Sequence, residues 1–300
     1  MFKKKILITG YSGFVGQNIL NFMGEKYDFE KLSLREPIKD FDNNLNYDAI
    51  IHLAGKAHDL RNVSAPDDYF TINRDATIKL FNNFLNSNIK DFFYFSSVKA
   101  VVDSIDGVLS EEQYPEPLTI YGKSKLEAEL YLLSTNIPDN KRVFIIRPCM
   151  IHGPGNKGNL NLLYKIVKNN LPWPLGAYDN SRSFIYIENL IFLISKMIHS
   201  NELPSGVYNF ADDEYLSTNE LISTISATLN KSNKILKVPK LFVEIAAKFG
   251  NLIPIPINSE RLNKLTESYR VSNYKIKKAL KIEKLPFTAK EGIIKTIKSF

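Results

Sequence analysis

The chain has 300 residues, of which 44% are hydrophobic, and its formal net charge is +7. This is enough apolar material for one large α/β domain, alone or with a smaller lobe. The single cysteine, Cys149, excludes an internal disulfide, and the four histidines show no ligand spacing, so we expect no metal site. The lysines are spread along the chain, which argues against a nucleic-acid partner. Without a long apolar run or a cleavable leader, we expect a cytoplasmic protein with no membrane partner.

The first predicted element is a strand at residues 5–9 that runs into a glycine-rich turn and then an amphipathic helix. This order is typical of the start of a βαβ unit that binds a nucleotide. The first glycine permits a tight turn, the second lets the backbone approach a pyrophosphate, and the third lets the helix pack on the strand. The N–H groups at the start of the helix would face the phosphates. The residues expected at the nucleotide are Gly10, Gly13, Phe14, Val15 and Gly16.

A second strand is predicted at residues 30–35, and its end is where such folds bind the adenine ribose. Arg35 would accommodate a 2′-phosphate, which tilts the prediction towards NADPH, whereas Glu36 would bind a free ribose if the strand ended one residue later. The connection that follows is too short for a full helix and strand, and it would bring Asp40 or Phe41 near the adenine.

Residues 48–55 form a continuous apolar run of the kind buried in a parallel sheet, and His52 within it is expected to be a satisfied core histidine. The small residues at the end of this strand would lie at the carboxyl edge of the sheet, where ligands bind. A helix is predicted from about Pro66 to Asn86, with Asn73 on its apolar face, and a strand at 91–97 ends in two serines.

Tyr121 and Lys125 lie four residues apart at the start of the next predicted helix, so they share one face. The spacing alone is weak evidence, because it also occurs at Tyr27, Tyr164 and Tyr274. Only Tyr121 follows a strand that ends in serine, in a sheet that already carries the glycine turn.

At this point the sequence resembles the extended short-chain dehydrogenases/reductases of the NAD-dependent epimerase/dehydratase family. The resemblance covers nearly the whole chain in order, and within the family it is closer to UDP-N-acetylquinovosamine 4-reductases and related 4-epimerases. The segments that carry it are 9–16, 52–58, 95–99, 121–125, 146–148, 153–155, 174–190 and 206–210.

The resemblance implies a Rossmann-type, doubly wound parallel sheet and a catalytic set of Ser97, Tyr121 and Lys125. The tyrosine would be the general acid/base, and the ammonium of the lysine would lower its pKa, which is about 10 in a free tyrosine. The lysine would also hold the nicotinamide ribose, and the serine would orient the reacting oxygen. Ser96 would only support the end of the strand. Besides the glycine turn, the expected cofactor contacts are Arg35, Leu53, Ala54, Gly55, Asn73, Tyr121, Lys125 and Pro148.

By the same resemblance, residues 1–150 form the cofactor domain and 183–205 return to it, while 151–182 and 206–300 form a small substrate lobe. Asn159 and Arg182 are the candidates for contacts with the phosphates or base of a UDP-sugar. Trp173 is interpreted as lobe core or as a base-stacking platform, and Cys149 as a packed thiol.

Three functions stay open. The first is an NADPH-dependent 4-keto reductase of a UDP-linked amino- or deoxy-sugar in the synthesis of surface polysaccharides. The second is a UDP-hexose 4-epimerase that retains NAD, and the third is a non-catalytic NADP(H) sensor. A 4,6-dehydratase is disfavoured, because Ser97-Val98-Lys99 stands where dehydratases have Thr-Asp-Glu. A homodimer is a further possibility by analogy with relatives.

Overall fold

The structure is a computed structural model that describes residues 3–35, 46–56, 65–156, 158–232, 234–250 and 258–300, apart from the side chain of Asn159. Glu36, Asp40 and Phe41, which the sequence places near the adenine, lie outside these residues.

A parallel sheet organises the larger part of the molecule, and among the described residues it has six strands in the order β2-β1-β3-β4-β6-β9. The strand order reverses between β1 and β3, which makes the sheet doubly wound and confirms the predicted fold class. The strands are β1 (Lys5–Thr9), β2 (Asp28–Leu32), β3 (Ala49–His52), β4 (Asp91–Phe95), β6 (Arg142–Pro148) and β9 (Gly206–Phe210).

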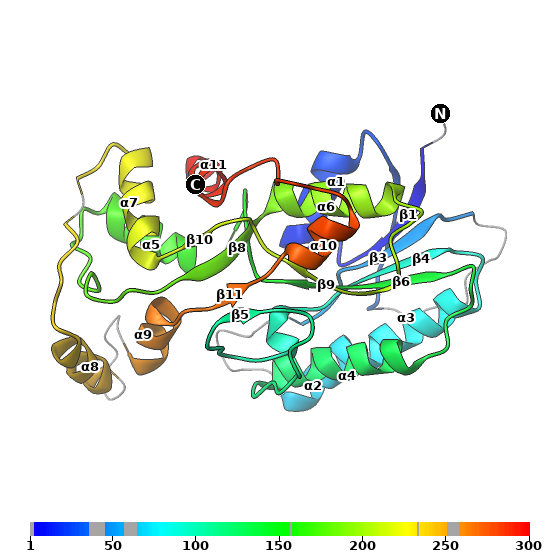
Figure 1. Ribbon diagram of the computed structural model, residues 1–300, viewed down its shortest axis with the longest axis horizontal. Coiled ribbons are helices and arrows are strands. Elements are labelled where there is room, and N and C mark those ends of the chain that lie inside the picture. The colour runs from blue at the N-terminus through cyan, green and yellow to red at the C-terminus, as the bar shows by residue number, and fades with distance from the viewer. Residues whose placement is uncertain (1–2, 36–45, 57–64, 157, 233, 251–257) are drawn as a thin grey trace.

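Helices cover both faces of this sheet (Figure 1). One face carries α1 (Phe14–Met23) and α6 (Ile187–His199), which pack against each other. The other carries α2 (Pro66–Phe70), a π-helical turn (Thr71–Asp75), α3 (Ala76–Leu85) and α4 (Ile120–Ser134). Because β3, β4 and β6 are buried on both faces, their sequences read as continuous apolar runs.

The second strand ends three residues earlier than the sequence pattern suggested. It pairs in register with β1, from Lys5 opposite Asp28 to Thr9 opposite Leu32, so it stops where β1 turns away at Gly10. Arg35 therefore lies in the bend beyond the strand.

His52 is a satisfied core histidine, as predicted. Its Nδ1 lies 2.7 Å from the hydroxyl of Thr9, and its Nε2 lies 2.8 Å from the hydroxyl of Thr77. Thr9 also accepts the N–H of Ala54, which fixes the chain just after β3. Burial lowers the pKa of His52 to about 3, so the ring is neutral at physiological pH.

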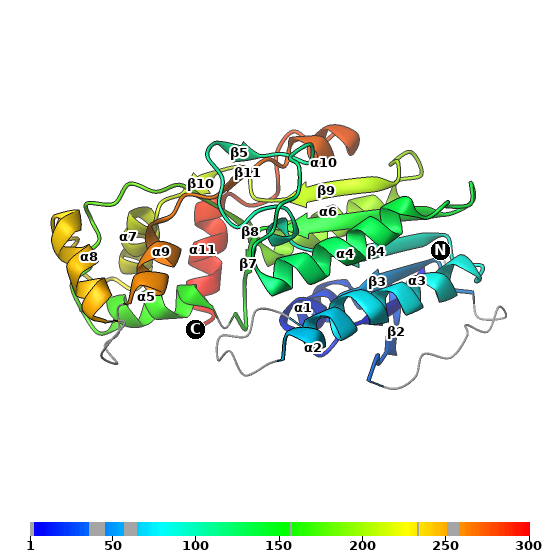
Figure 2. The same cartoon turned by 90° about the horizontal axis from the view of Figure 1, so that it is seen from below.

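A second body extends from the carboxyl side of the sheet (Figure 2). It contains α5 (Asn159–Lys168), α7 (Thr218–Thr228), α8 (Lys240–Phe249), α9 (Ser259–Thr266) and α11 (Ala289–Lys298), and its apolar core includes Trp173. A small sheet, β10-β8-β7, leads into it from β7 (Met150–His152) through β8 (Arg182–Tyr186) to β10 (Tyr215–Leu216). The shortest elements are β5 (Val108–Leu109), β11 (Arg270–Val271), α10 (Tyr274–Ala279) and a 3-10 turn (Val98–Ala100).

The boundary of this lobe differs from the sequence-based one, because residues 206–210 are not part of it. They form β9, which pairs with β6 from Phe144 opposite Gly206 to Pro148 opposite Phe210. The segment extends the hydrogen-bond ladder of the main sheet, with the N–H of Asn209 bonded to the carboxylate of Glu111, and the chain turns towards the lobe after it.

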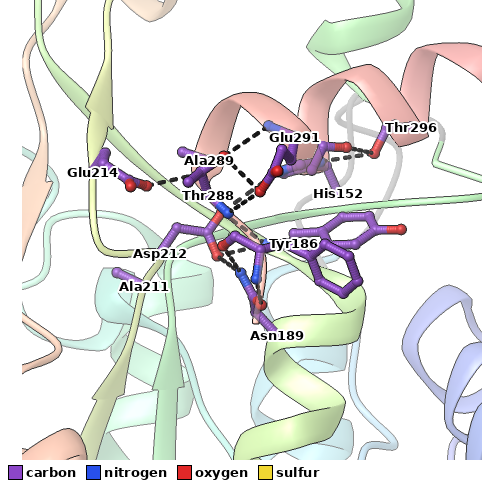
Figure 3. A network of polar contacts seen from close by, with 12 residues as sticks. His152, Tyr186, Asn189, Ala211, Asp212, Glu214, Thr288, Ala289, Glu291 and Thr296 are labelled. Carbon is purple, nitrogen blue, oxygen red and sulfur yellow. Dashed lines mark hydrogen bonds and ion pairs between the residues drawn. The ribbon is translucent and has the colours of Figure 1, made fainter. Parts of the chain in front are cut away.

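A buried polar network joins the C-terminal helix α11 to β7, β8 and α6 (Figure 3). The carboxylate of Asp212 accepts the N–H of Tyr186 at 3.1 Å and the amide of Asn189 at 2.8 Å. Nε2 of His152 lies 3.9 Å from this carboxylate, and its Nδ1 lies 2.9 Å from the hydroxyl of Thr296 on α11. Burial raises the pKa of Asp212 to about 7 and lowers that of His152 to about 3. The network therefore holds a neutral imidazole beside a carboxyl group that titrates near neutrality.

Among the described residues, no helix has the length and apolarity that a membrane span requires.

Candidate active site

Two adjoining pockets open at the carboxyl ends of β3, β4 and β6. The first has a volume of about 310 Å³ and brings together residues from separate parts of the chain. The second, of about 220 Å³, shares Ser97, Pro148 and Cys149 with it and extends towards the lobe. The first pocket is lined by Val15, Leu53, Gly55, Lys56, Phe95, Ser96, Ser97, Tyr121, Lys125, Pro148, Cys149 and Ile151.

The glycine turn between β1 and α1 has the conformation that its sequence predicts. Gly10 has a φ of 64°, and a methyl group at this position would lie 2.6 Å from the backbone nitrogen of Ala54. A methyl group at Gly16 would lie 2.5 Å from the carbonyl oxygen of Gly10, so helix and strand need glycine here to pack. Gly13 is the N-cap of α1 and makes no side-chain cap, so the end of this helix is left as backbone N–H groups suited to a phosphate.

Asn73 acts on the pocket through its neighbours. It is fully buried in the π-helical turn, where it accepts the N–H of Lys56 at 2.7 Å and donates to the carbonyl of Lys56 at 3.0 Å. It also donates to the hydroxyl of Ser124 on α4 at 3.0 Å. Asn73 therefore fixes the loop at Gly55 against the helix that carries Tyr121, and the cofactor contact expected of it from the sequence stays a prediction.

Tyr121 and Ser97 face the same pocket from two different elements. Ser97 ends the segment after β4 and caps the short 3-10 turn by accepting the N–H of Lys99. Tyr121 lies in the first turn of α4, where the hydroxyl of Thr119 caps the helix through the N–H of Gly122. Burial raises the pKa of Tyr121, although the hydroxyl of Ser97 lowers it in part. The net shift of this pKa is upward, opposite to the lowering expected from Lys125, because desolvation of the buried phenol is the largest cause.

Lys125 is buried one turn after Tyr121, and its ammonium donates to the carbonyl of Phe95 at 2.9 Å. The same group lies 5.0 Å from the ring centroid of Tyr94. Burial lowers the pKa of Lys125 to about 8, and the charge of Glu129 partly offsets this effect. The side chain of Lys125 is therefore charged at neutral pH and loses its proton at mildly alkaline pH.

An ion pair that was not predicted from the sequence lies behind this lysine. Glu129 is fully buried on α4, and both oxygens of its carboxylate accept hydrogen bonds from the guanidinium of Arg147 on β6. The Nε atom of Arg147 lies 3.0 Å from each oxygen, and its Nη2 donates to Oε2. Only the position of Arg147 before Pro148 at the end of a strand marked it in the sequence. Its partner could not be found without the packing of α4 on the sheet.

The second pocket is bounded by residues that come together only in the fold, among them Lys99, Arg182 and Tyr269. Arg182, a predicted substrate contact, starts β8, donates to the carbonyl of Lys264 and lies 3.9 Å from a carboxylate oxygen of Glu267. The ammonium of Lys99 lies 4.3 Å from the ring centroid of Tyr269 and donates to the carbonyl of Asp103. Arg182 and Lys99 thus give this pocket a positive wall.

The remaining predicted residues fall in different places. Arg35 is exposed, and its N–H bonds the hydroxyl of Ser33. Asn159 begins α5, but its side chain is outside the described residues. Trp173 is 2% exposed and donates to Asn219, so it is lobe core. Cys149 is buried with a raised pKa, as expected of a packed thiol.

A doubly wound parallel sheet with a glycine turn, and a serine, a tyrosine and a lysine around one pocket, define the class of extended short-chain dehydrogenases/reductases. The model of the NAD dependent epimerase/dehydratase family matches residues 6–211, and the chain belongs to that family. It is an enzyme family that works with a nicotinamide cofactor.

Named relatives extend over almost the whole chain. The chain is 29% identical to a UDP-glucose 4-epimerase of Vibrio cholerae, over 99% of this chain and 95% of the relative. It is 26% identical to an N-acetyl-α-D-glucosaminyl-diphospho-ditrans,octacis-undecaprenol 4-epimerase of Escherichia coli O157:H7, over 97% and 94% of the two chains. Among solved structures, the RMD protein of Pseudomonas aeruginosa in complex with NADPH has a TM-score of 0.74 at 20% identity, covering 99% of each chain.

The residues around the first pocket fit a nicotinamide nucleotide. The turn at Gly10 and the free start of α1 suit a pyrophosphate. A methyl group at Gly55 would lie 3.0 Å from the ammonium nitrogen of Lys125, so glycine keeps the space beside this lysine open. Leu53, Pro148 and Ile151 give the pocket an apolar wall.

Proposed function

We propose that the protein reduces or oxidises carbon 4 of a hexose that is linked to a diphosphate, by hydride transfer with NAD(P)(H). The observation that carries the proposal is the gathering of Ser97, Tyr121 and Lys125 on one pocket beside Gly55. The adjoining pocket, with Arg182 and Lys99 on its wall, suits a diphosphate. The two named relatives act on sugars linked to a diphosphate, which supports the same substrate class.

The position of these three side chains around one pocket supports the following roles. The cofactor supplies or accepts a hydride when it is bound. Tyr121 moves the proton to or from the sugar oxygen, Ser97 hydrogen-bonds that oxygen, and Lys125 holds the ribose hydroxyls with its ammonium. Of the other predicted contacts, Leu53, Ala54 and Pro148 would bound the nicotinamide end, and Gly13, Phe14 and Val15 the phosphates.

Within this class, the finer proposal is an NADPH-dependent reductase of a UDP-linked 4-keto sugar. Two observations support it. Arg35 stands just after β2, where a guanidinium can pair with a 2′-phosphate. Burial raises the pKa of Tyr121, so its phenol is protonated at neutral pH and can give a proton to a keto oxygen.

The second candidate is a 4-epimerase that retains NAD, and the names of the two relatives favour it. It would use the same three residues in both directions. The intact Tyr121 and Lys125 pair argues against a non-catalytic sensor.

The first experiment is to denature the purified protein and identify the nucleotide that it releases. Near-stoichiometric NAD would favour the epimerase. A site that is refilled by NADPH in preference to NADH would favour the reductase, and the assay would then be NADPH oxidation with a UDP-4-keto-6-deoxy-hexosamine.

Tyr121→Phe tests the shared chemistry of both candidates. We expect turnover to fall by at least about a hundredfold, because a general acid contributes this much, while cofactor affinity stays within about twofold. A variant that keeps wild-type turnover would overturn the role of Tyr121 and, with it, the proposed site.

A further inference from the structure

Helix α8 carries two apolar faces, and only one of them is packed. Val243 and Ala247 are buried in the core of the lobe. Four large apolar side chains of this ten-residue helix are exposed, and these are Leu241 at 64%, Phe242 at 63%, Ile245 at 43% and Phe249 at 60%.

The four exposed side chains form one stripe. Leu241, Ile245 and Phe249 follow one another at four-residue intervals, and Phe242 lies beside them three residues before Ile245. At 3.6 residues per turn they share one side of the helix, and Val243 and Ala247 lie on the opposite side. Single exposed apolar residues are common on protein surfaces, but a continuous stripe of four marks an interaction surface.

Lysines are frequent in this helix and in the segment that precedes it. Residues 231–250 contain five lysines and one acid, Glu244. Four of the lysines are exposed, and they are Lys234, Lys237, Lys240 and Lys248. Within the described residues, no ion pair joins these four to an acidic group. The surface therefore combines an apolar stripe with a net positive charge, and this combination suits contact with an anionic bilayer.

The position of α8 allows such contact without obstruction of the active site. The helix lies at the end of the lobe that is furthest from the parallel sheet, in both views of the molecule (Figures 1 and 2). The two pockets lie at the carboxyl edge of the sheet, between its strands and the lobe.

We propose that the exposed face of α8 docks on a membrane surface that contains anionic lipids. The apolar stripe enters the boundary between headgroups and acyl chains, and the lysines meet the lipid phosphates. This goes beyond the proposed function and differs from the sequence-based expectation of no membrane partner. That expectation rested on spanning segments, whereas docking of this kind needs none.

The test is co-sedimentation of the full chain with vesicles of phosphatidylcholine and phosphatidylglycerol in equal amounts, and with vesicles of phosphatidylcholine alone. We expect the protein to sediment with the anionic vesicles, with at least about tenfold weaker binding to the neutral ones. Replacement of one lysine, as in Lys237→Gln, should weaken binding by about fivefold, and added salt should reduce the binding of the wild type.

Phe242→Ser/Phe249→Ser removes the two aromatic members of the stripe and leaves Val243 and Ala247 in place. We expect this variant to lose at least about tenfold in vesicle binding and to keep the wild-type melting temperature. The matched control is Phe22→Ser/Tyr274→Ser, which removes two exposed aromatic side chains from α1 and α10, and it should bind like the wild type.

The proposal is overturned if the wild type stays in solution with anionic vesicles, or if the stripe variant binds as well as the control. It is also overturned if analytical ultracentrifugation shows the wild type and the control as dimers and the stripe variant as a monomer. The exposed face of α8 would then be an interface between two copies of the chain. Vesicle binding is measured without substrate, so its outcome does not depend on whether the proposed catalytic activity is correct.

Discussion

Replacement of Glu129 by glutamine should move the alkaline limit of activity and also destabilise the fold. Glu129 lies one helical turn after Lys125, so the two side chains are neighbours on α4. Two unit charges about 6 Å apart interact by about 2.8 kcal/mol at an effective dielectric of about 20, which corresponds to at most about two pKa units. Since the pKa of Lys125 is about 8, we expect it to fall to about 6–7 in the variant.

The direction of this pKa shift follows from the loss of the negative charge of Glu129. The carboxylate of Glu129 favours the charged form of Lys125, so the variant lysine is neutral at a lower pH. If the ammonium of Lys125 is required, kcat/KM of the wild type declines above about pH 8, and that of Glu129→Gln declines above a pH about one to two units lower. The assay is kcat/KM for NADPH oxidation across about pH 5.5–9.5, by about half-unit steps.

Stability is the second readout, because the change leaves the guanidinium of Arg147 buried without its partner. Such a loss costs about 3–5 kcal/mol. The double variant Glu129→Gln/Arg147→Met removes both charges and should recover most of this free energy of unfolding. Its alkaline limit should stay displaced, since the carboxylate beside Lys125 is still absent. An alkaline limit that coincides with the wild type in both variants would refute the reasoning.

Three other changes have definite expected outcomes. Gly55→Ala places a methyl group 3.0 Å from both Lys125 Nζ and Asn73 Oδ1, so cofactor affinity in a fluorescence titration should fall about tenfold, and Gly158→Ala, which meets only ordinary contacts, should not change it. Arg35→Asp should lower the NADPH to NADH ratio of kcat/KM by at least about tenfold; an unchanged ratio would remove Arg35 from the site. Asp212 keeps its proton up to about pH 7 when folded but releases it near pH 4 when unfolded, so its contribution to stability falls as pH rises through this window. The melting temperature of the wild type relative to Asp212→Asn should therefore fall from about pH 4 to about pH 7, and a constant difference would contradict the raised pKa.

Local features of the site were predictable from the sequence, and long-range ones were not. The glycine turn and the Tyr121 to Lys125 spacing are each contained in one turn and one helix, so their residue types decide their geometry. The ends of strands depend on partners, which is why β2 stops with β1 and why residues 206–210 belong to the main sheet.

The electrostatic environment of the site is the property that the sequence predicts least well. The spacing on α4 correctly placed an ammonium one turn from a phenol, but the pKa of Tyr121 follows from how much water the surrounding elements exclude. Lys99 and Tyr269 line one pocket although 170 residues separate them, and no motif links them.

The path of the chain has a consequence for how the molecule can be divided. After β6 the backbone enters the lobe through β7 and α5 and returns to the main sheet through β8, α6 and β9. It enters the lobe again at α7, passes back through β11 and α10, and ends in α11. No single cut separates a complete lobe from a complete sheet, and the network of Asp212 and His152 connects the last helix to β7 and β8. Heat or denaturant should consequently melt both parts in one transition, and neither half should be recoverable as a folded fragment.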